Sequence, residues 1–171
     1  MSYPIKYSSA TINDAIQTMA KQLVANQIVT DQTVFFVLLN GGVWFASHLF
    51  DALGDLPNEV YYAKCHSYDG QTRKELMWDY QPQMNITGRD VVVLDDICDS
   101  GQTATAVVHA LQQSAKSVAV VTLLKRETTH INDIPLYSCI TDHTDDFFVG
   151  CGLDDNGRNR MLPFIGIVAK G

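Results

Sequence analysis

Basic side chains are scarce in this chain: 12 Lys and Arg stand against 19 Asp and Glu, which gives a formal net charge of −7 at pH 7. Nucleic acids and anionic membranes are bound mainly through a basic face, so this balance argues against both as the main partner. No apolar run approaches the length of a membrane span, and the N-terminus lacks the basic-then-apolar pattern of a secretory signal. We therefore expect a cytoplasmic protein.

Several common site motifs are also absent. The chain has four cysteines without CxxC spacing and five histidines without ligand spacing, which argues against a Cys or His metal site and for reduced thiols. It has no GxGxxG fingerprint for a dinucleotide, and no triphosphate P-loop with a Lys before its Ser or Thr. An anion bound here must be held by a different kind of loop.

The most informative stretch is residues 91–103, VVVLDDICDSGQT. Its first four residues are apolar, as in a strand buried on both faces of a parallel sheet. Asp95 and Asp96 follow at the carboxyl end, the edge where open α/β sheets bind ligands. Asp99 then opens a tight turn into a helix predicted over residues 104–114, and a helix start of this kind favours anions. The turn continues through Ser100, Gly101, Gln102 and Thr103.

A turn this short suits one terminal phosphate. Three carboxylates beside a phosphate would repel it, unless they bind sugar hydroxyls or act together with a divalent cation such as Mg²⁺. The stretch therefore predicts a site for a phosphorylated ribose.

Apolar strands alternate with helical patterns over the first 125 residues, which predicts an α/β fold with a mostly parallel twisted sheet flanked by helices. A second turn at the same sheet edge, Asn40-Gly41-Gly42, either admits an anion to its backbone amides or is simply tight. The expected helices are residues 11–25, 43–53 and 104–114, and the expected strands are residues 34–39, 59–65, 91–94 and 117–124.

We expect a single domain over residues 1–171, with a core at about 10–130. From residue 136 the alternation stops, and short strands at 136–141, 147–149 and 164–168 predict a small antiparallel hood, completed by the N-terminal segment. The long polar stretch 67–87 is typical of a flexible lid over a site, with residues 75–80 as one strand of a ribbon.

The stretch 91–103 resembles the phosphoribosyl-diphosphate motif of type I phosphoribosyltransferases: four hydrophobic residues, two acids, then Asp-Ser/Thr-Gly and Thr. Softer matches follow in order over residues 34–168 and are most similar to the hypoxanthine-guanine members. The resemblance implies the fold of that family and purine salvage. The implied reaction moves the phosphoribosyl group of 5-phosphoribosyl 1-diphosphate to hypoxanthine or guanine, giving IMP or GMP and pyrophosphate. It also implies Mg²⁺ as cofactor and a homodimer or homotetramer.

The resemblance further implies how the sugar and its phosphates bind. The loop 99–103 would hold the 5-phosphate, and Asp95 and Asp96 would hold the ribose hydroxyls and Mg²⁺. Asp154 would help bind a second Mg²⁺. The pyrophosphate would meet Asn40, Gly41, Gly42 and Arg160. The family often has Lys at the position of Asn40, so only the backbone role is carried over there.

For the purine, the resemblance implies that Asp99 holds the proton of the five-membered ring. Phe147 would stack on the base, Phe148 would offer backbone atoms to its edge near Asp154, and Lys125 would donate to the 6-oxo group. An ammonium only donates, so it would select a carbonyl over an amino group. In the lid, Ser67 and Tyr68 match the pair that closes over the ligands.

Three alternatives remain open. A receiver domain of a phosphorelay also has paired acids and a late Lys, but it leaves DSGQT unexplained. An RNA-binding regulator of the same fold is a second possibility, although the acidic balance weighs against it. The third is a transferase of this fold that uses xanthine or a pyrimidine; Lys125 with an aromatic at Phe147 favours a 6-oxopurine.

Overall fold

The computed structural model describes residues 3–69, 74–129 and 131–169. Its main element is a six-stranded sheet in the order β4-β3-β2-β5-β6-β7, in which every neighbouring pair is parallel except β3 and β4. This architecture confirms the α/β prediction. The strands are β2 (Val34–Leu38), β3 (Val60–Asp69), β4 (Lys74–Tyr80), β5 (Asp90–Cys98), β6 (Ser117–Arg126) and β7 (Leu136–Asp142).

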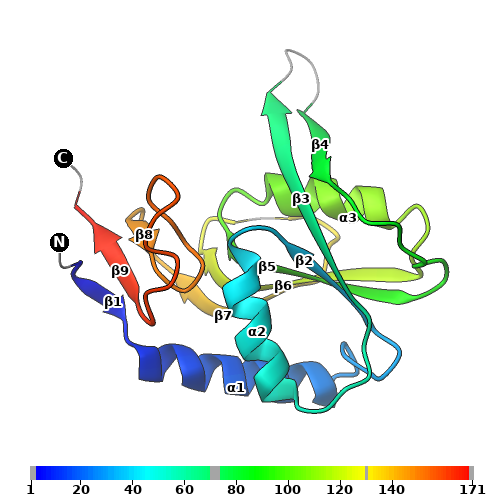
Figure 1. Cartoon of the computed structure of the whole chain (residues 1–171), viewed down its shortest axis with the longest axis horizontal. Coiled ribbons are helices and arrows are strands. Elements are labelled where there is room, and N and C mark those ends of the chain that lie inside the picture. Colours follow the sequence, from blue (N-terminus) through cyan, green and yellow to red (C-terminus); the bar gives the residue numbers. More distant parts are fainter. Residues whose placement is uncertain (1–2, 70–73, 130, 170–171) are drawn as a thin grey trace.

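Helices cover both faces of the sheet (Figure 1). The helices α1 (Ser9–Ala25) and α2 (Gly42–Leu53) pack with one hydrophobic cluster, and α3 (Gln102–Leu111) packs with a second cluster on the opposite face. Strand β2 is buried along its whole length, as its continuous apolar run predicts. Helix α1 begins earlier than expected because Ser8 caps it, its Oγ accepting from the Thr11 N–H at 3.2 Å.

Strand β7 differs from the expectation. The sequence analysis placed residues 136–141 in the hood, whereas β7 pairs in parallel with β6 as the edge strand of the main sheet. Parallel strands are normally joined by a helical crossover of a dozen or more residues, and the link from β6 to β7 is shorter and has no helical pattern. The partly polar, half-buried β7 also lacks the apolar run that marks an interior strand.

The hood is a separate three-stranded antiparallel sheet in the order β1-β9-β8, formed by β1 (Ile5–Tyr7), β8 (Phe147–Val149) and β9 (Ile165–Val168). The two ends of the chain therefore meet in it, beside the carboxyl edge of the main sheet (Figure 1). Of the three short strands expected here, the last two are found in the hood.

Strands β3 and β4 form a long antiparallel hairpin that projects from the body of the molecule, so the expected ribbon exists (Figure 1). Ser67 and Tyr68 belong to the β3 backbone, but their side chains lie outside the described residues, and so do residues 70–73 altogether. Their role as a lid stays a prediction. In the part of the chain that the structure describes, no helix is long and apolar enough to cross a membrane.

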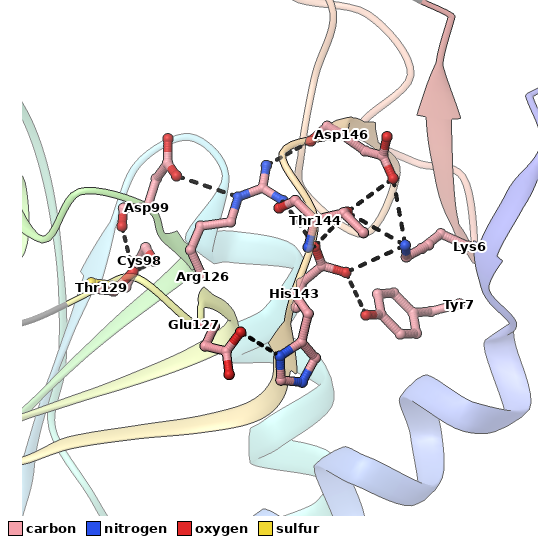
Figure 2. Close-up of polar contacts among 11 residues, drawn as sticks. Lys6, Tyr7, Cys98, Asp99, Arg126, Glu127, Thr129, His143, Thr144 and Asp146 are labelled. Carbon is pink, nitrogen blue, oxygen red and sulfur yellow. Dashed lines mark hydrogen bonds and ion pairs between the residues drawn. The ribbon is translucent and has the colours of Figure 1, made fainter.

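A buried polar network attaches the hood to the main sheet (Figure 2). At its centre is Asp142, at the end of β7, whose side chain is 1% exposed. Its carboxylate accepts from the Tyr7 hydroxyl at 2.6 Å, from Arg126 Nη1 at 3.1 Å and from Thr144 Oγ1 at 2.7 Å, and Lys6 Nζ lies 3.7 Å away. The network thus joins β1, β6 and β7.

The network also sets the protonation of Asp142. Burial raises the pKa of this carboxyl, but hydrogen bonds from Tyr7 and Thr144 and the positive charge of Lys6 outweigh burial and lower the pKa to about 2. A carboxyl with a lowered folded-state pKa stabilises the fold above its ordinary pKa, and this stabilisation is lost as pH falls toward the folded value.

We therefore expect the free energy of unfolding to lose roughly 2 kcal/mol through Asp142 as pH falls from about 4 to 2. Urea unfolding between pH 5 and pH 2.5 measures this loss. Asp142→Asn should be less stable at pH 5 but should lose less stability on acidification. The exposed Asp55→Asn, at a carboxyl outside this network, is the control variant. An Asp142→Asn variant as acid-sensitive as wild type would contradict the assignment.

Candidate functional site

The adjacent acids Asp95 and Asp96 lie near the end of β5, which runs on to Cys98 rather than ending at residue 94. The Asp96 N–H donates to Asp95 Oδ1 at 2.9 Å, and the Ile97 N–H donates to Asp96 Oδ1 at 2.8 Å. Burial raises the pKa of both carboxyls, and the negative charge of Asp96 raises that of Asp95 further. Two crowded carboxyls in this environment favour a cation or hydroxyl donors as ligands.

The turn after β5 forms a cradle for an anion. Gly101 adopts a left-handed conformation with φ of 76°, which allows the chain to reverse directly into α3. The turn, with Asp95, lines a cavity of about 100 Å³ at the start of that helix. Thr129 fixes the turn from outside, because its single Oγ1–H is shared between the Cys98 carbonyl, at 2.8 Å, and the carbonyl of Asp99.

Thr122 is a buried polar group that the sequence analysis missed. It pairs with Asp95 across β5 and β6 and lines the same cavity. Its side chain is fully buried, and within the described residues its Oγ1 has no hydrogen-bond partner. A threonine in the middle of an apolar strand gives no signal of this kind, because only the register with β5 shows what it faces.

The turn after β2 packs directly on the acid pair. A Cβ at Gly41 would overlap the Asp96 carboxylate, and a Cβ at Gly152, in the hood, would overlap the Gly41 carbonyl. Glycine therefore allows this turn to pack closely on the acid pair, and the binding of an anion by its backbone amides stays a prediction. Asn40, beside these glycines, is exposed.

The hood contributes Asp154 and Arg160 to the same edge. Arg160 Nη2 lies 2.6 Å from Asp154 Oδ1, and its Nη1 donates to the Gly152 carbonyl at 2.7 Å. The Gly157 N–H donates to Asp154 Oδ2 at 2.6 Å. The charge of Arg160 also acts to lower the pKa of Asp96, so this arginine lies near the acid pair.

A wider pocket of about 680 Å³ adjoins the anion cradle on the hood side. Asp99, Arg126 and Phe147 lie along its wall, and the ring of Phe147 is largely exposed while Phe148 is buried. Asp99 is shared by the wider pocket and the cradle. An exposed aromatic ring and a carboxylate in one pocket suit a planar base that carries N–H groups.

The structure thus brings together most of the predicted site residues. Lys125 is different: it is not among the described residues that line the wider pocket, and its role stays a prediction. Arg126, the next residue of β6, does line it. Burial raises the pKa of the Cys98 thiol to about 11, which is typical of an unreactive packing residue.

The described side chains by themselves supply few ligands for a metal ion. Within residues 3–69, 74–129 and 131–169, no three His, Cys, Asp or Glu side chains are grouped so that they could hold a metal ion. Mg²⁺, however, commonly takes one or two carboxylates and completes its shell with water and substrate phosphates. The oxygen donors of Asp95 and Asp96 fit that ion.

Comparisons with known proteins point to one family. The family described as "Phosphoribosyl transferase domain" matches residues 8–156. A hypoxanthine phosphoribosyltransferase of Salmonella typhimurium is 31% identical over 80% of this chain and 78% of its own length. A hypoxanthine-guanine-xanthine phosphoribosyltransferase of Tritrichomonas foetus is 30% identical over 97% of this chain and 91% of its own. A solved hypoxanthine phosphoribosyltransferase of Staphylococcus aureus superposes with a TM-score of 0.85 at 26% identity, covering 96% of this chain and 90% of its own.

The glycine contact can be tested without straining the backbone. Gly41 has φ of −66° and ψ of −42°, which alanine adopts freely, so Gly41→Ala adds only a methyl group against Asp96. We expect a loss of about 1–3 kcal/mol in the free energy of unfolding from overpacking. Chemical denaturation measures it, with Val43→Ala, at an exposed position two residues further along the chain, as the control. An unchanged stability for Gly41→Ala would show that the turn does not press on Asp96.

Proposed function

This chain belongs to the phosphoribosyltransferase domain family, and on that premise we propose that it transfers a 5-phosphoribosyl group to a 6-oxopurine. The donor is 5-phosphoribosyl 1-diphosphate, the acceptors are hypoxanthine and guanine, and the products are IMP or GMP and pyrophosphate, a reaction of purine salvage. The observation that carries the proposal is the shared carboxylate of Asp99, which lines both the anion cradle and the pocket that contains Phe147.

The cradle supports binding of the 5-phosphate. The backbone N–H groups of Ser100 to Thr103 open the helix α3, where the helix dipole favours negative charge. Asp95 and Asp96 accept hydrogen bonds from the ribose hydroxyls, and the turn at Gly41 and Gly42 offers its backbone to the pyrophosphate. Arg160 supplies positive charge on the same side.

Mg²⁺ is part of the proposal, bound by the oxygens of Asp95 and Asp96 together with the substrate, and by Asp154 for a second ion. When bound, it stabilises the negative charge of the departing pyrophosphate. The Asp154 carboxylate forms an ion pair with Arg160. This pair would have to rearrange before Asp154 could bind the second Mg²⁺.

The purine enters the pocket beside the cradle. Phe147 stacks on its ring, the backbone of Phe148 meets its edge, and a basic side chain at the end of β6 reads the 6-oxo group. A ring nitrogen attacks the anomeric carbon as the carbon–oxygen bond to pyrophosphate breaks, and the electron pair leaves with the pyrophosphate. Asp99 accepts a hydrogen bond from the proton on the five-membered ring, or takes that proton. The hairpin with Ser67 and Tyr68 closes over the ligands, because an exposed oxocarbenium-like sugar would react with water.

Several finer points belong to the same proposal. The relatives include an enzyme named for xanthine as well as hypoxanthine and guanine, so xanthine is the second candidate base. An assembly of two or four copies and a cytoplasmic location follow from the resemblance and the composition.

The first test is a spectrophotometric assay with 5-phosphoribosyl 1-diphosphate and Mg²⁺, in which hypoxanthine, guanine, xanthine, adenine and uracil are offered separately. We expect turnover of hypoxanthine or guanine, and we expect a chelator of divalent cations to abolish it. Turnover of xanthine or uracil alone would replace the proposed base. A folded protein that turns over none of the five bases would contradict the proposal, and RNA binding would then be measured.

The second test concerns the proton. Asp99→Asn keeps the shape of the side chain but removes the base, so we expect turnover to fall by about 100-fold while the affinity for 5-phosphoribosyl 1-diphosphate stays within a few-fold. Steady-state kinetics and titration calorimetry separate the two effects. Asp31→Asn, at an exposed loop distant from the site, is the control. Undiminished turnover in Asp99→Asn would remove the proton role.

A further inference from the structure

The side chain of Thr122, in the second half of β6, carries a hydroxyl that the fold itself does not use. The residue is fully buried, and its Oγ1 has no hydrogen-bond partner within the part of the chain that the structure describes. A buried hydroxyl of this kind costs stability, because the hydrogen bonds that it makes with water in the unfolded chain are not replaced on folding. Valine has nearly the same shape and avoids this cost, so the hydroxyl calls for a reason other than packing.

The register of the sheet places Thr122 beside Asp95. The two residues pair across the parallel strands β5 and β6, and strands in such a sheet lie about 5 Å apart. Both residues line the cavity at the start of α3, and so do Val93 and Val120, which pair with each other two residues earlier on the same strands. Thr122 therefore lies on the cradle side of the sheet, next to a carboxylate.

Asp95 has the capacity to accept a further hydrogen bond. Its Oδ1 accepts from the Asp96 N–H at 2.9 Å, and an ionised carboxylate offers about four acceptor positions in all. In Thr122, rotation about the Cα–Cβ bond exchanges the hydroxyl with a methyl group of similar size. The hydroxyl can therefore turn toward Asp95 with little change in the volume that the side chain fills.

We propose that Thr122 is a positioning residue for the sugar-phosphate donor, because its hydroxyl donates to the Asp95 carboxylate when the ribose binds and fixes the orientation of that carboxylate. This inference rests on the proposed transfer from 5-phosphoribosyl 1-diphosphate. A hydrogen bond to a charged acceptor is stronger than one between neutral groups, and a carboxylate that accepts from two sides is held in one orientation. The buried hydroxyl thus lowers the stability of the fold and raises the affinity for the donor.

The test measures stability and donor binding separately. Thr122→Val removes only the hydroxyl, so we expect its midpoint of urea denaturation to equal or exceed that of the wild type. Its KM for 5-phosphoribosyl 1-diphosphate should rise by at least about tenfold, as expected for a lost hydrogen bond to a charged group, while its KM for hypoxanthine should change by less than about twofold. Thr122→Ser keeps the hydroxyl and should keep the wild-type KM for the donor to within about threefold.

Thr33→Val is the matched control. Thr33 is also buried, but its Oγ1 accepts from the Thr30 N–H at 2.9 Å. It directly precedes β2, so it lies at the amino ends of the parallel strands, the edge of the sheet opposite the site. Loss of this satisfied hydroxyl should lower the denaturation midpoint and leave the KM for the donor unchanged.

Two results would overturn the proposal. One is a Thr122→Val variant with the wild-type KM for the donor. The other is a Thr122→Val variant as destabilised as Thr33→Val, because the hydroxyl would then already have a partner in the fold. If Thr122→Val does not fold, a crystal structure of the wild type with IMP and Mg²⁺ decides: Thr122 Oγ1 should lie about 3 Å from an Asp95 carboxylate oxygen, and a contact with the phosphate instead, or no contact, would overturn the inference.

Failure of this inference can be told apart from failure of the proposed function. Lack of turnover by the wild type with every base would refute both. Normal wild-type turnover together with an unchanged donor KM in Thr122→Val would refute the inference alone.

Discussion

The buried ion pair of Arg126 and Asp142 is the contact on which the geometry of the wider pocket depends. Both side chains are largely removed from water, at 13% and 1% exposure. A charge left alone in such a place costs about 3–5 kcal/mol, so neither partner can move without the other. The pair joins β6 to β7, and through Tyr7 and Lys6 it also holds β1. The placement of the hood on the main sheet is therefore set by a buried polar network as well as by apolar packing.

The parallel sheet explains why segments far apart in the sequence form one site. The strands β2, β5 and β6 run in the same direction, so their carboxyl ends deliver three turns to one edge. Two of the turns touch through Gly41 and Asp96, and the hood reaches both through Gly152. Space is limited by backbone atoms at Gly42 and Gly152 and by the Asp96 side chain at Gly41, so a Cβ at any of these positions would force a neighbour to shift.

The parts of the site that lie within one continuous motif could be predicted from the sequence. Residues 91–103 combine an apolar strand, two acids and a glycine turn, and each of these has a local physical meaning that tertiary contacts do not change. The same is true of strand β2 and of helices α1 to α3, because their apolar patterns predict the bounds of each element to within a few residues.

The contacts that close the pocket could not be predicted in the same way. Lys6 and Asp146 are 140 positions apart and meet only because the chain ends fold into one hood. The face of the main sheet on which the side chain of Arg126 lies is likewise not evident from the sequence, because a shift of one residue in a strand exchanges its two faces. Thr122 was missed for a similar reason, since its importance comes from Asp95 on the neighbouring strand.

The two halves of the site differ in how far the protein satisfies its own polar groups. At the base end, four N–H groups of Arg126 are bonded within the protein, so the walls of that pocket are fixed before a ligand arrives. At the sugar end, burial raises the pKa of Asp95 and Asp96, and the Thr122 hydroxyl has no protein partner among the described residues. Ionised carboxylates with raised pKa values cost folding free energy at neutral pH, and hydroxyl donors or a cation would offset that cost. A rigid pocket for the base beside an under-satisfied cradle for the sugar phosphate suits an enzyme in which one end discriminates among similar bases and the other draws its affinity from charge.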